Sequence, residues 1–165
     1  SEPGDPQPEP ATPQPLSSPP ATPRRAGRTI TTVIVHHSES THGDTTAIDQ
    51  WHRERGWDGV GYHYVITNGI SHSGQPCEDG EIQTGRGEHV VGAHARGRNQ
   101  RSIGICLIGT DAFTHAQRRS LCSLLGELCR RHGITPSDAT IRRHHEQCPG
   151  VGLNLEAIIE EMAAE

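Results

Sequence analysis

The stretch SIGICLIG, Ser102 to Gly109, is a short apolar run that ends at a glycine. A continuous apolar run of this length is typical of a strand buried on both faces, and such strands lie in the interior of a sheet. We therefore place it at the centre of a sheet. A second run, Ile30 to Val35, consists only of β-branched residues and is followed by the polar His36 to Ser38, which predicts another buried strand.

Helical patterns alternate with these strands. Thr114 to Gln117 fits a capping box, and the leucines after it have the i, i+3, i+4, i+7 spacing of one helix face. We expect three helices, with approximate bounds Asp44 or Thr45 to Arg55, Thr114 to Arg131, and Leu155 to Ala164. Strands interleaved with helices predict an α/β fold with a single mixed β-sheet flanked by helices.

The remaining strand signals are shorter. Tyr62 to Thr67 has the composition of a strand, and Asn68-Gly69 directly after it is a strong hairpin-turn signal. Glu81 to Arg86 fits a further short strand. We therefore expect a hairpin centred on Asn68-Gly69.

Composition divides the chain into two parts. Ser1 to Gly27 is rich in proline and almost free of large apolar side chains, so we expect a disordered, extended linker. Arg28 to Glu165 is long enough for one folded domain. The net charge of -5, with both signs interspersed, argues against a nucleic-acid binder. No apolar run reaches the roughly 18 residues of a membrane span, and without an obvious apolar surface stripe we expect a monomer.

The cysteines are five in number, so at least one is outside any intramolecular disulfide. Cys122 and Cys129 lie seven apart on an expected helix, a rise of about 10 Å, whereas bridged Cα atoms lie within roughly 7 Å. These two cannot pair. Cys106 lies in the central apolar run and is expected to be a small core residue. Cys148 differs, because histidines precede it closely.

Two segments, VIVHHS (Val33 to Ser38) and HHEQCPG (His144 to Gly150), together offer two His positions and one Cys. This is the ligand set of an open zinc site, in which three protein ligands leave one position for a water. Alternate side chains of a strand point to opposite faces, so only one of each adjacent His pair is expected to be a ligand. A solvated cluster among the 12 histidines is one alternative. Another is a cysteine hydrolase with Cys148 as nucleophile and His144 as base.

The order of four segments resembles a known family. VHHSES, QWHRERGWDGVGYHYVI, GAHARGRNQRSIGICLIG and HHEQCPG follow one another as in the zinc-dependent N-acetylmuramoyl-L-alanine amidases, the family shared by short phage lysozymes and peptidoglycan recognition proteins. The resemblance covers Thr31 to Leu155. It implies that family's fold, a zinc ion and hydrolysis of the amide bond between N-acetylmuramic acid and L-alanine in bacterial peptidoglycan. A non-catalytic peptidoglycan-binding module is the alternative within the same family.

The resemblance also implies roles for single residues. It places the zinc ligands at His36, His144 and Cys148. The tyrosine of the GYH motif, Tyr62, is expected beside the metal, where its hydroxyl would donate a hydrogen bond to the tetrahedral oxyanion. His94 and Asn99, in GAHARGRN, are expected to bind the glycan or the peptide of the substrate.

The chain departs from the family between the late histidine and the cysteine. Active phage members have a longer loop there, with a lysine two positions before the cysteine, where this chain has Glu146. A carboxylate can act as a base but cannot stabilise an oxyanion while ionised. We therefore expect Glu146 to be the general base, or the base to be missing.

The expected substrate implies a location. An amidase must meet the cell wall, and a proline-rich segment ahead of the domain suits a spacer. The sequence begins with Ser rather than Met, which agrees with a processed secreted protein or a trimmed chain. We expect an extracytoplasmic protein, periplasmic or secreted, rather than a phage lysozyme acting from the cytosol.

Overall fold

The sheet is built around the predicted central strand. The computed structural model describes residues 28–165, so the expected linker, Ser1 to Gly27, lies outside the described residues. Within them, the apolar run forms β4 (Ser102–Leu107), the middle strand of a five-stranded sheet with the order β3-β2-β4-β1-β5. All six residues of β4 are buried, as expected of a strand covered on both faces.

The sheet is mixed, as predicted. β1 (Thr32–His37) and β2 (Tyr64–Ile70) lie on either side of β4 and run parallel to it. β3 (Pro76–Thr84) is antiparallel to β2, and β5 (Ile141–Arg143) is parallel to β1. The parallel strands β1, β2, β4 and β5 therefore all have their carboxyl ends at the same end of the sheet.

The hairpin prediction at Asn68-Gly69 is wrong in its position. Both residues lie inside β2, where the pairing with β3 shifts register, and Gly69 has a φ of 95°. The chain turns later, where the Ser71 N–H donates to the Gln75 carbonyl at 2.8 Å. A glycine at positive φ serves a β-bulge as well as a tight turn, so the dipeptide alone does not distinguish the two.

The helices begin at or within one residue of their predicted starts. Asp44 precedes α1 (Thr45–Glu54), and a complete capping box formed by Thr114 and Gln117 starts α2 (His115–His132). The side chain of Asn154 accepts a hydrogen bond from the first turn of α3 (Leu155–Ala163). Among the described residues no helix has the length and apolarity needed to cross a membrane.

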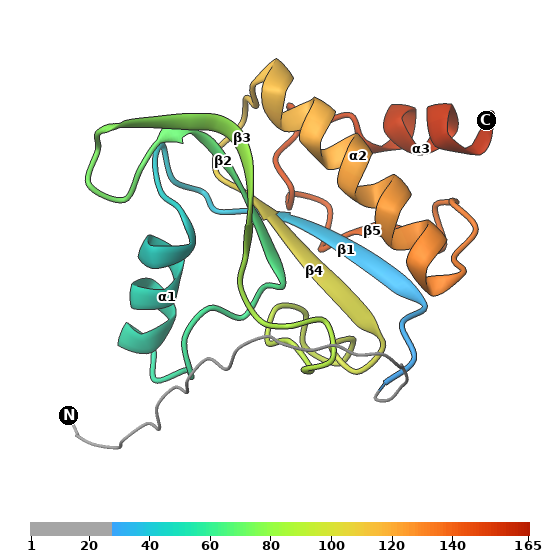
Figure 1. The fold of residues 1–165 in the computed structure, drawn as a ribbon, viewed down its shortest axis with the longest axis horizontal. Coiled ribbons are helices and arrows are strands. Elements are labelled where there is room, and N and C mark those ends of the chain that lie inside the picture. Colours follow the sequence, from blue (N-terminus) through green and yellow to red (C-terminus); the bar gives the residue numbers. More distant parts are fainter. Residues whose placement is uncertain (1–27) are drawn as a thin grey trace.

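The two faces of the sheet carry different cores. α2 and α3 cover one face and α1 lies on the other side (Figure 1). The larger cluster includes Val33 and Val35 of β1, packed with leucines of α2. The smaller cluster joins Ile48 of α1 to Val65 and Cys106. Because side chains alternate along a strand, His36 projects on the α1 face, level with Cys106 of β4.

Candidate metal centre and adjoining groove

The pairing of β1 with β5 brings two histidines together. Arg143 of β5 lies opposite Val35 of β1, so the next residues on the two strands, His144 and His36, are neighbours. The His144 N–H donates to the Val35 carbonyl at 3.3 Å, and the centroids of the two imidazole rings lie 4.4 Å apart. β5 was not predicted from the sequence, because three residues, Ile-Arg-Arg, carry too little pattern to mark a strand.

A tight turn then returns Cys148 to this pair. The backbones of His145 and Cys148 exchange two hydrogen bonds of 3.0 Å, which leaves only Glu146 and Gln147 at the tip. The Cys148 sulfur lies 4.0 Å from His36 Nδ1. One ligand atom from each of His36, His144 and Cys148 lies within 4.8 Å of the other two. The short spacing between His144 and Cys148 therefore does not keep the cysteine away from the histidines.

The donor set fits a zinc ion. Two imidazole nitrogens and one thiolate are typical zinc ligands, and at Zn–N and Zn–S distances of about 2.1 and 2.3 Å the ligand atoms of a tetrahedron lie roughly 3.5 Å apart. Adjustments of about 1 Å would bring these three atoms to that spacing. His36 and Cys148 are buried, whereas His144 is half-buried. Solvent therefore reaches the group on the side of His144, while the protein covers it on the side of His36 and Cys148.

The protonation states of the group also suit a metal. Burial, and then the neighbouring His94, hold the pKa of His36 well below its ordinary value, and burial lowers the pKa of His144. Both rings are therefore neutral near pH 7, the form that binds metals. Burial raises the pKa of the Cys148 thiol, so a metal has to displace a proton from it.

His37 lies next to the group without belonging to it. Its ring projects on the face opposite His36, with its centroid 6.3 Å from that of Phe113. Even so, His37 Nδ1 lies 3.3 Å from the Cys148 sulfur. Strand alternation correctly separates the two adjacent histidines, but it did not reveal this contact, because Cys148 lies beyond the end of the strand and reaches both faces.

Tyr62 lies beside the group, as expected. Its ring centroid is 5.0 Å from that of His36. The ring of His52, from α1, packs against Tyr62, and His52 Nδ1 accepts a hydrogen bond of 3.0 Å from the Gly61 N–H. These contacts fix the backbone and the ring of Tyr62. Burial raises the pKa of the Tyr62 hydroxyl well above its ordinary value, so the hydroxyl keeps its proton and can act as a donor.

A groove of about 520 Å³ opens from Tyr62 and His144. His94 and Asn99, the predicted substrate-binding residues, are part of its wall. The other polar and aromatic residues of the lining, none of which was predicted to bind substrate, are His52, Arg55, Trp57 and Arg96. The Arg55 guanidinium lies over the ring of Trp57, 5.5 Å from its centroid, and Trp57 is 42% exposed. The groove therefore offers an aromatic surface and positive charge next to the metal-binding group.

This site can be set beside known proteins. The family model for N-acetylmuramoyl-L-alanine amidases matches residues 26–151. The chain belongs to this amidase family. It is 43% identical over 110 residues to the endolysin of Escherichia phage T7, a match that spans 62% of this chain and 64% of the endolysin. The match thus covers less than two thirds of the phage protein's own length.

Solved structures share the fold. The N-acetylmuramoyl-L-alanine amidase LysC from Clostridium intestinale URNW is similar with a TM-score of 0.70 and 30% identity, over 82% of this chain and 86% of LysC. Drosophila PGRP-LB is similar with a TM-score of 0.58 and 28% identity, over 81% of each chain. The predicted family and fold class are therefore confirmed.

Glu146, the predicted base, lies apart from the buried centre of the candidate site. It is exposed at the tip of the turn between His145 and Cys148, and it is not among the residues that line the groove. Its carboxylate also lies outside the close group formed by the two histidines and the cysteine. The structure thus brings six of the seven residues predicted for the site to the group and its groove, and leaves Glu146 at the rim.

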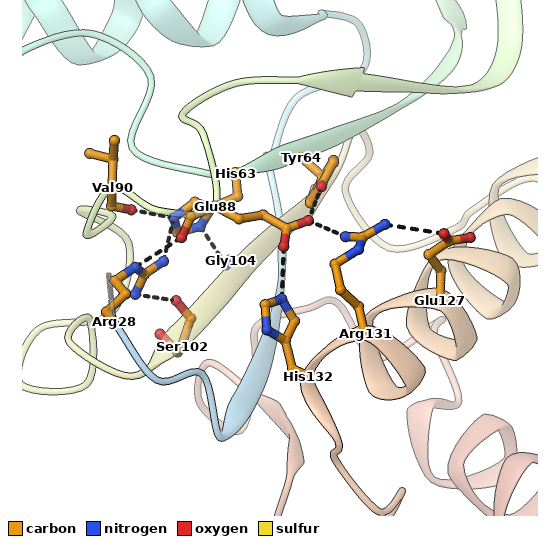
Figure 2. A network of polar contacts seen from close by, with 10 residues as sticks. All are labelled: Arg28, His63, Tyr64, Glu88, Val90, Ser102, Gly104, Glu127, Arg131 and His132. Atoms are coloured by element: carbon orange, nitrogen blue, oxygen red, sulfur yellow. Dashed lines mark hydrogen bonds and ion pairs between the residues drawn. The ribbon is translucent and has the colours of Figure 1, made fainter. Parts of the chain in front are cut away.

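The groove wall that carries His94 and Asn99 is anchored through Glu88. Figure 2 shows Glu88, near the start of this wall, accepting hydrogen bonds from Tyr64, Arg131 and His132. Burial alone would raise the pKa of the Glu88 carboxyl, but the hydrogen bonds from Tyr64 and His132 and the charge of Arg131 lower it below its ordinary value. The Glu88 carbonyl also accepts from Arg28 Nε at 2.9 Å. The segment between β3 and β4 is thereby tied to α2 and β2.

Proposed function

We propose that the protein is a zinc-dependent amidase that hydrolyses the bond between N-acetylmuramic acid and L-alanine in bacterial peptidoglycan. The observation that carries this proposal is the convergence of His36, His144 and Cys148 at the end of a groove in a chain of the amidase family. Three protein ligands are the number found in catalytic zinc sites, which keep one position open. When bound there, zinc would polarise the scissile carbonyl and lower the pKa of a water molecule.

Tyr62 supplies the hydrogen bond that the reaction needs at its oxyanion. Its hydroxyl is protonated at neutral pH, because burial raises its pKa, and its ring is adjacent to that of His36. A donor aimed at a developing oxyanion contributes about 3 kcal/mol in enzymes of this kind. Tyr62 is therefore the residue of this chain that we expect to favour the transition state over the bound substrate.

The groove binds and orients the substrate. Arg55 and Arg96 place positive charge along it, and a stem peptide carries carboxylates that this charge attracts. Trp57 offers a flat apolar surface against which a sugar or a peptide side chain can pack. The Asn99 Oδ1 is engaged by backbone N–H groups, so its amide N–H groups are the part of this side chain that is proposed to contact substrate.

A cysteine hydrolase fits these surroundings less well. A nucleophilic cysteine needs an accessible sulfur with a lowered pKa, whereas Cys148 is 5% exposed and burial raises the pKa of its thiol. The same sulfur lies close to His36 Nδ1, which suits a shared metal. These observations favour Cys148 as a ligand.

The substrate determines where the protein acts. Peptidoglycan lies outside the cytoplasmic membrane, so we propose a periplasmic or secreted protein that meets the wall directly.

The test is mass spectrometry of purified peptidoglycan incubated with the chelated protein and again after zinc is returned. We expect intact stem peptides with a free L-alanine amino terminus, released only when zinc is present. Binding of the sacculi by zinc-loaded protein without any release would instead support a peptidoglycan-binding module. Release that persists in the chelated protein would support the cysteine hydrolase.

A further inference from the structure

His94 forms the second link in a chain of side-chain contacts that starts at a proposed metal ligand. His36 Nε2 lies 2.8 Å from His94 Nδ1, and His94 Nε2 lies 3.2 Å from Ser102 Oγ. Ser102 Oγ in turn donates to the Arg98 carbonyl at 2.7 Å. Distances alone do not show which nitrogen of each ring carries the proton. The last hydrogen bond in the series, from Ser102 to the Arg98 carbonyl, does.

A carbonyl oxygen can only accept, so the single hydroxyl proton of Ser102 points to Arg98. Ser102 Oγ must then accept from His94, which places the His94 proton on Nε2. In a neutral ring this leaves His94 Nδ1 as an acceptor, and the proton between the two rings belongs to His36 Nε2. His36 Nδ1 therefore presents a lone pair, and it is this atom that lies 4.0 Å from the Cys148 sulfur.

The surrounding backbone is shaped to hold the His94 ring. A Cβ atom added to Gly104 would lie 2.5 Å from His94 Cγ, and one added to Gly92 would lie 2.7 Å from His94 Cδ2. Both distances are shorter than real Cβ contacts, so the ring occupies space that only glycine leaves open. The Asn99 Oδ1 accepts from the N–H groups of His94 and Ala95, each at 2.9 Å. The ring and its backbone are thus both fixed.

The same segment reaches the second histidine ligand. The Arg98 carbonyl is the last acceptor in the series of contacts that starts at His36. The guanidinium of Arg98 donates to the His144 carbonyl at 2.6 Å. One short piece of chain therefore contacts both histidines of the group.

We propose that residues 92–102 form a clamp that orients the metal ligands before the metal binds, with His94 as the positioning residue that fixes the tautomer and the ring plane of His36. This inference rests on the proposed function, because it takes His36 as a zinc ligand. It also changes the role expected for His94. Both of its ring nitrogens are used inside the protein, so neither remains for a hydrogen bond to substrate.

The clamp has a measurable consequence for metal affinity. Residues that hydrogen-bond to metal-ligating histidines typically contribute a factor of about 10–100 to metal affinity. His94→Ala should therefore weaken zinc binding by about 10–100-fold, as measured by competition with a chromogenic chelator. His94→Asn should recover most of the loss, since its Oδ1 can take the place of Nδ1 as acceptor from His36. His89→Ala, at an exposed histidine of the preceding segment, is the matched control and should bind zinc like the wild type.

A second measurement does not depend on any variant. Nitrogen-15 NMR of the imidazole rings in the chelated wild-type protein should show His36 and His94 both protonated on Nε2. Protonation of His36 on Nδ1 would overturn the inference, as would wild-type zinc affinity in His94→Ala. Failure of the wild type to bind zinc would refute the proposed function instead, so the two failures can be told apart.

Discussion

His63 provides a quantitative test of how burial lowers the pKa of a histidine next to the site. Its side chain is fully buried, Nδ1 accepts from the Gly104 N–H at 3.0 Å, and Nε2 lies 2.8 Å from the Val90 carbonyl (Figure 2). Because the Gly104 N–H can only donate, a neutral ring carries its proton on Nε2, which faces both the Val90 carbonyl and the Arg28 guanidinium, the latter at 2.9 Å. Burial is the main cause that lowers the pKa of His63 to about 4. We consider the change His63→Asn, which keeps an acceptor for Gly104.

The sign and size of the effect follow from this pKa. Between pH 6.5 and pH 4 the unfolded chain takes up a proton on His63 that the folded chain does not, so the free energy of unfolding decreases as the pH falls through this window. With pKa values of about 6.5 unfolded and about 4 folded, His63 alone removes about 2 kcal/mol of stability between pH 7 and pH 5. Asparagine does not titrate there, so the variant should lose about 2 kcal/mol less.

Urea unfolding of the chelated protein at pH 7 and pH 5 measures this difference. Chelation is needed because bound metal would add a pH dependence of its own. His89→Asn, at an exposed histidine, serves as control and should retain the wild-type loss. If wild type and His63→Asn lose the same stability between the two pH values, the reasoning from burial is refuted.

Three further changes test the site itself. Tyr62→Phe should lower kcat about 100-fold or more through loss of the oxyanion donor while zinc affinity stays unchanged; a parallel loss of zinc affinity would contradict that role. Cys148→Ser removes the thiolate and should weaken zinc binding by more than the roughly 100-fold expected for loss of a residue that only hydrogen-bonds to a ligand. Unchanged binding in a chelator competition would exclude Cys148 as a ligand. Glu146→Gln should cost less than about tenfold in kcat, because the carboxylate is exposed outside the groove lining, whereas a loss of about 100-fold or more would establish Glu146 as the general base.

The parts of the fold that the sequence predicts well are those with a strong local pattern. The buried residues of β4 form a short apolar run, and the run before His36 is β-branched throughout, so local composition favours a strand at both places. The capping box at Thr114 predicts the start of α2 for the same reason, since its side chains satisfy the first backbone groups of the helix locally. Interactions within a few residues decide these elements.

The parts that the sequence does not predict depend on pairing between distant segments. β5 exists because Ile141–Arg143 lies beside β1, and nothing in three residues indicates such a partner. Asn68-Gly69 is a turn signal in the sequence, but the pairing of β2 with β3 places a bulge there instead. The proposed metal ligands were predicted through the family resemblance, but the reason they meet is the unpredicted β5, which places His144 next to His36.

The contact between His94 and His36 was not predicted from the sequence either. The motif GAHARGRN suggested a groove residue, and His94 does line the groove. Its bond to His36 depends on the space left by Gly104, ten residues later on a different element. Only the assembled structure relates the two.

The central claim is that the group of His36, His144 and Cys148 is a catalytic zinc centre. Zinc should be titrated into the chelated protein in steps below one equivalent, with amide cleavage of peptidoglycan and protein-bound zinc measured on the same samples. We predict that the cleavage rate rises linearly with bound zinc and becomes constant at one equivalent. Cleavage before any zinc is bound, or no cleavage with one equivalent bound, would contradict the account.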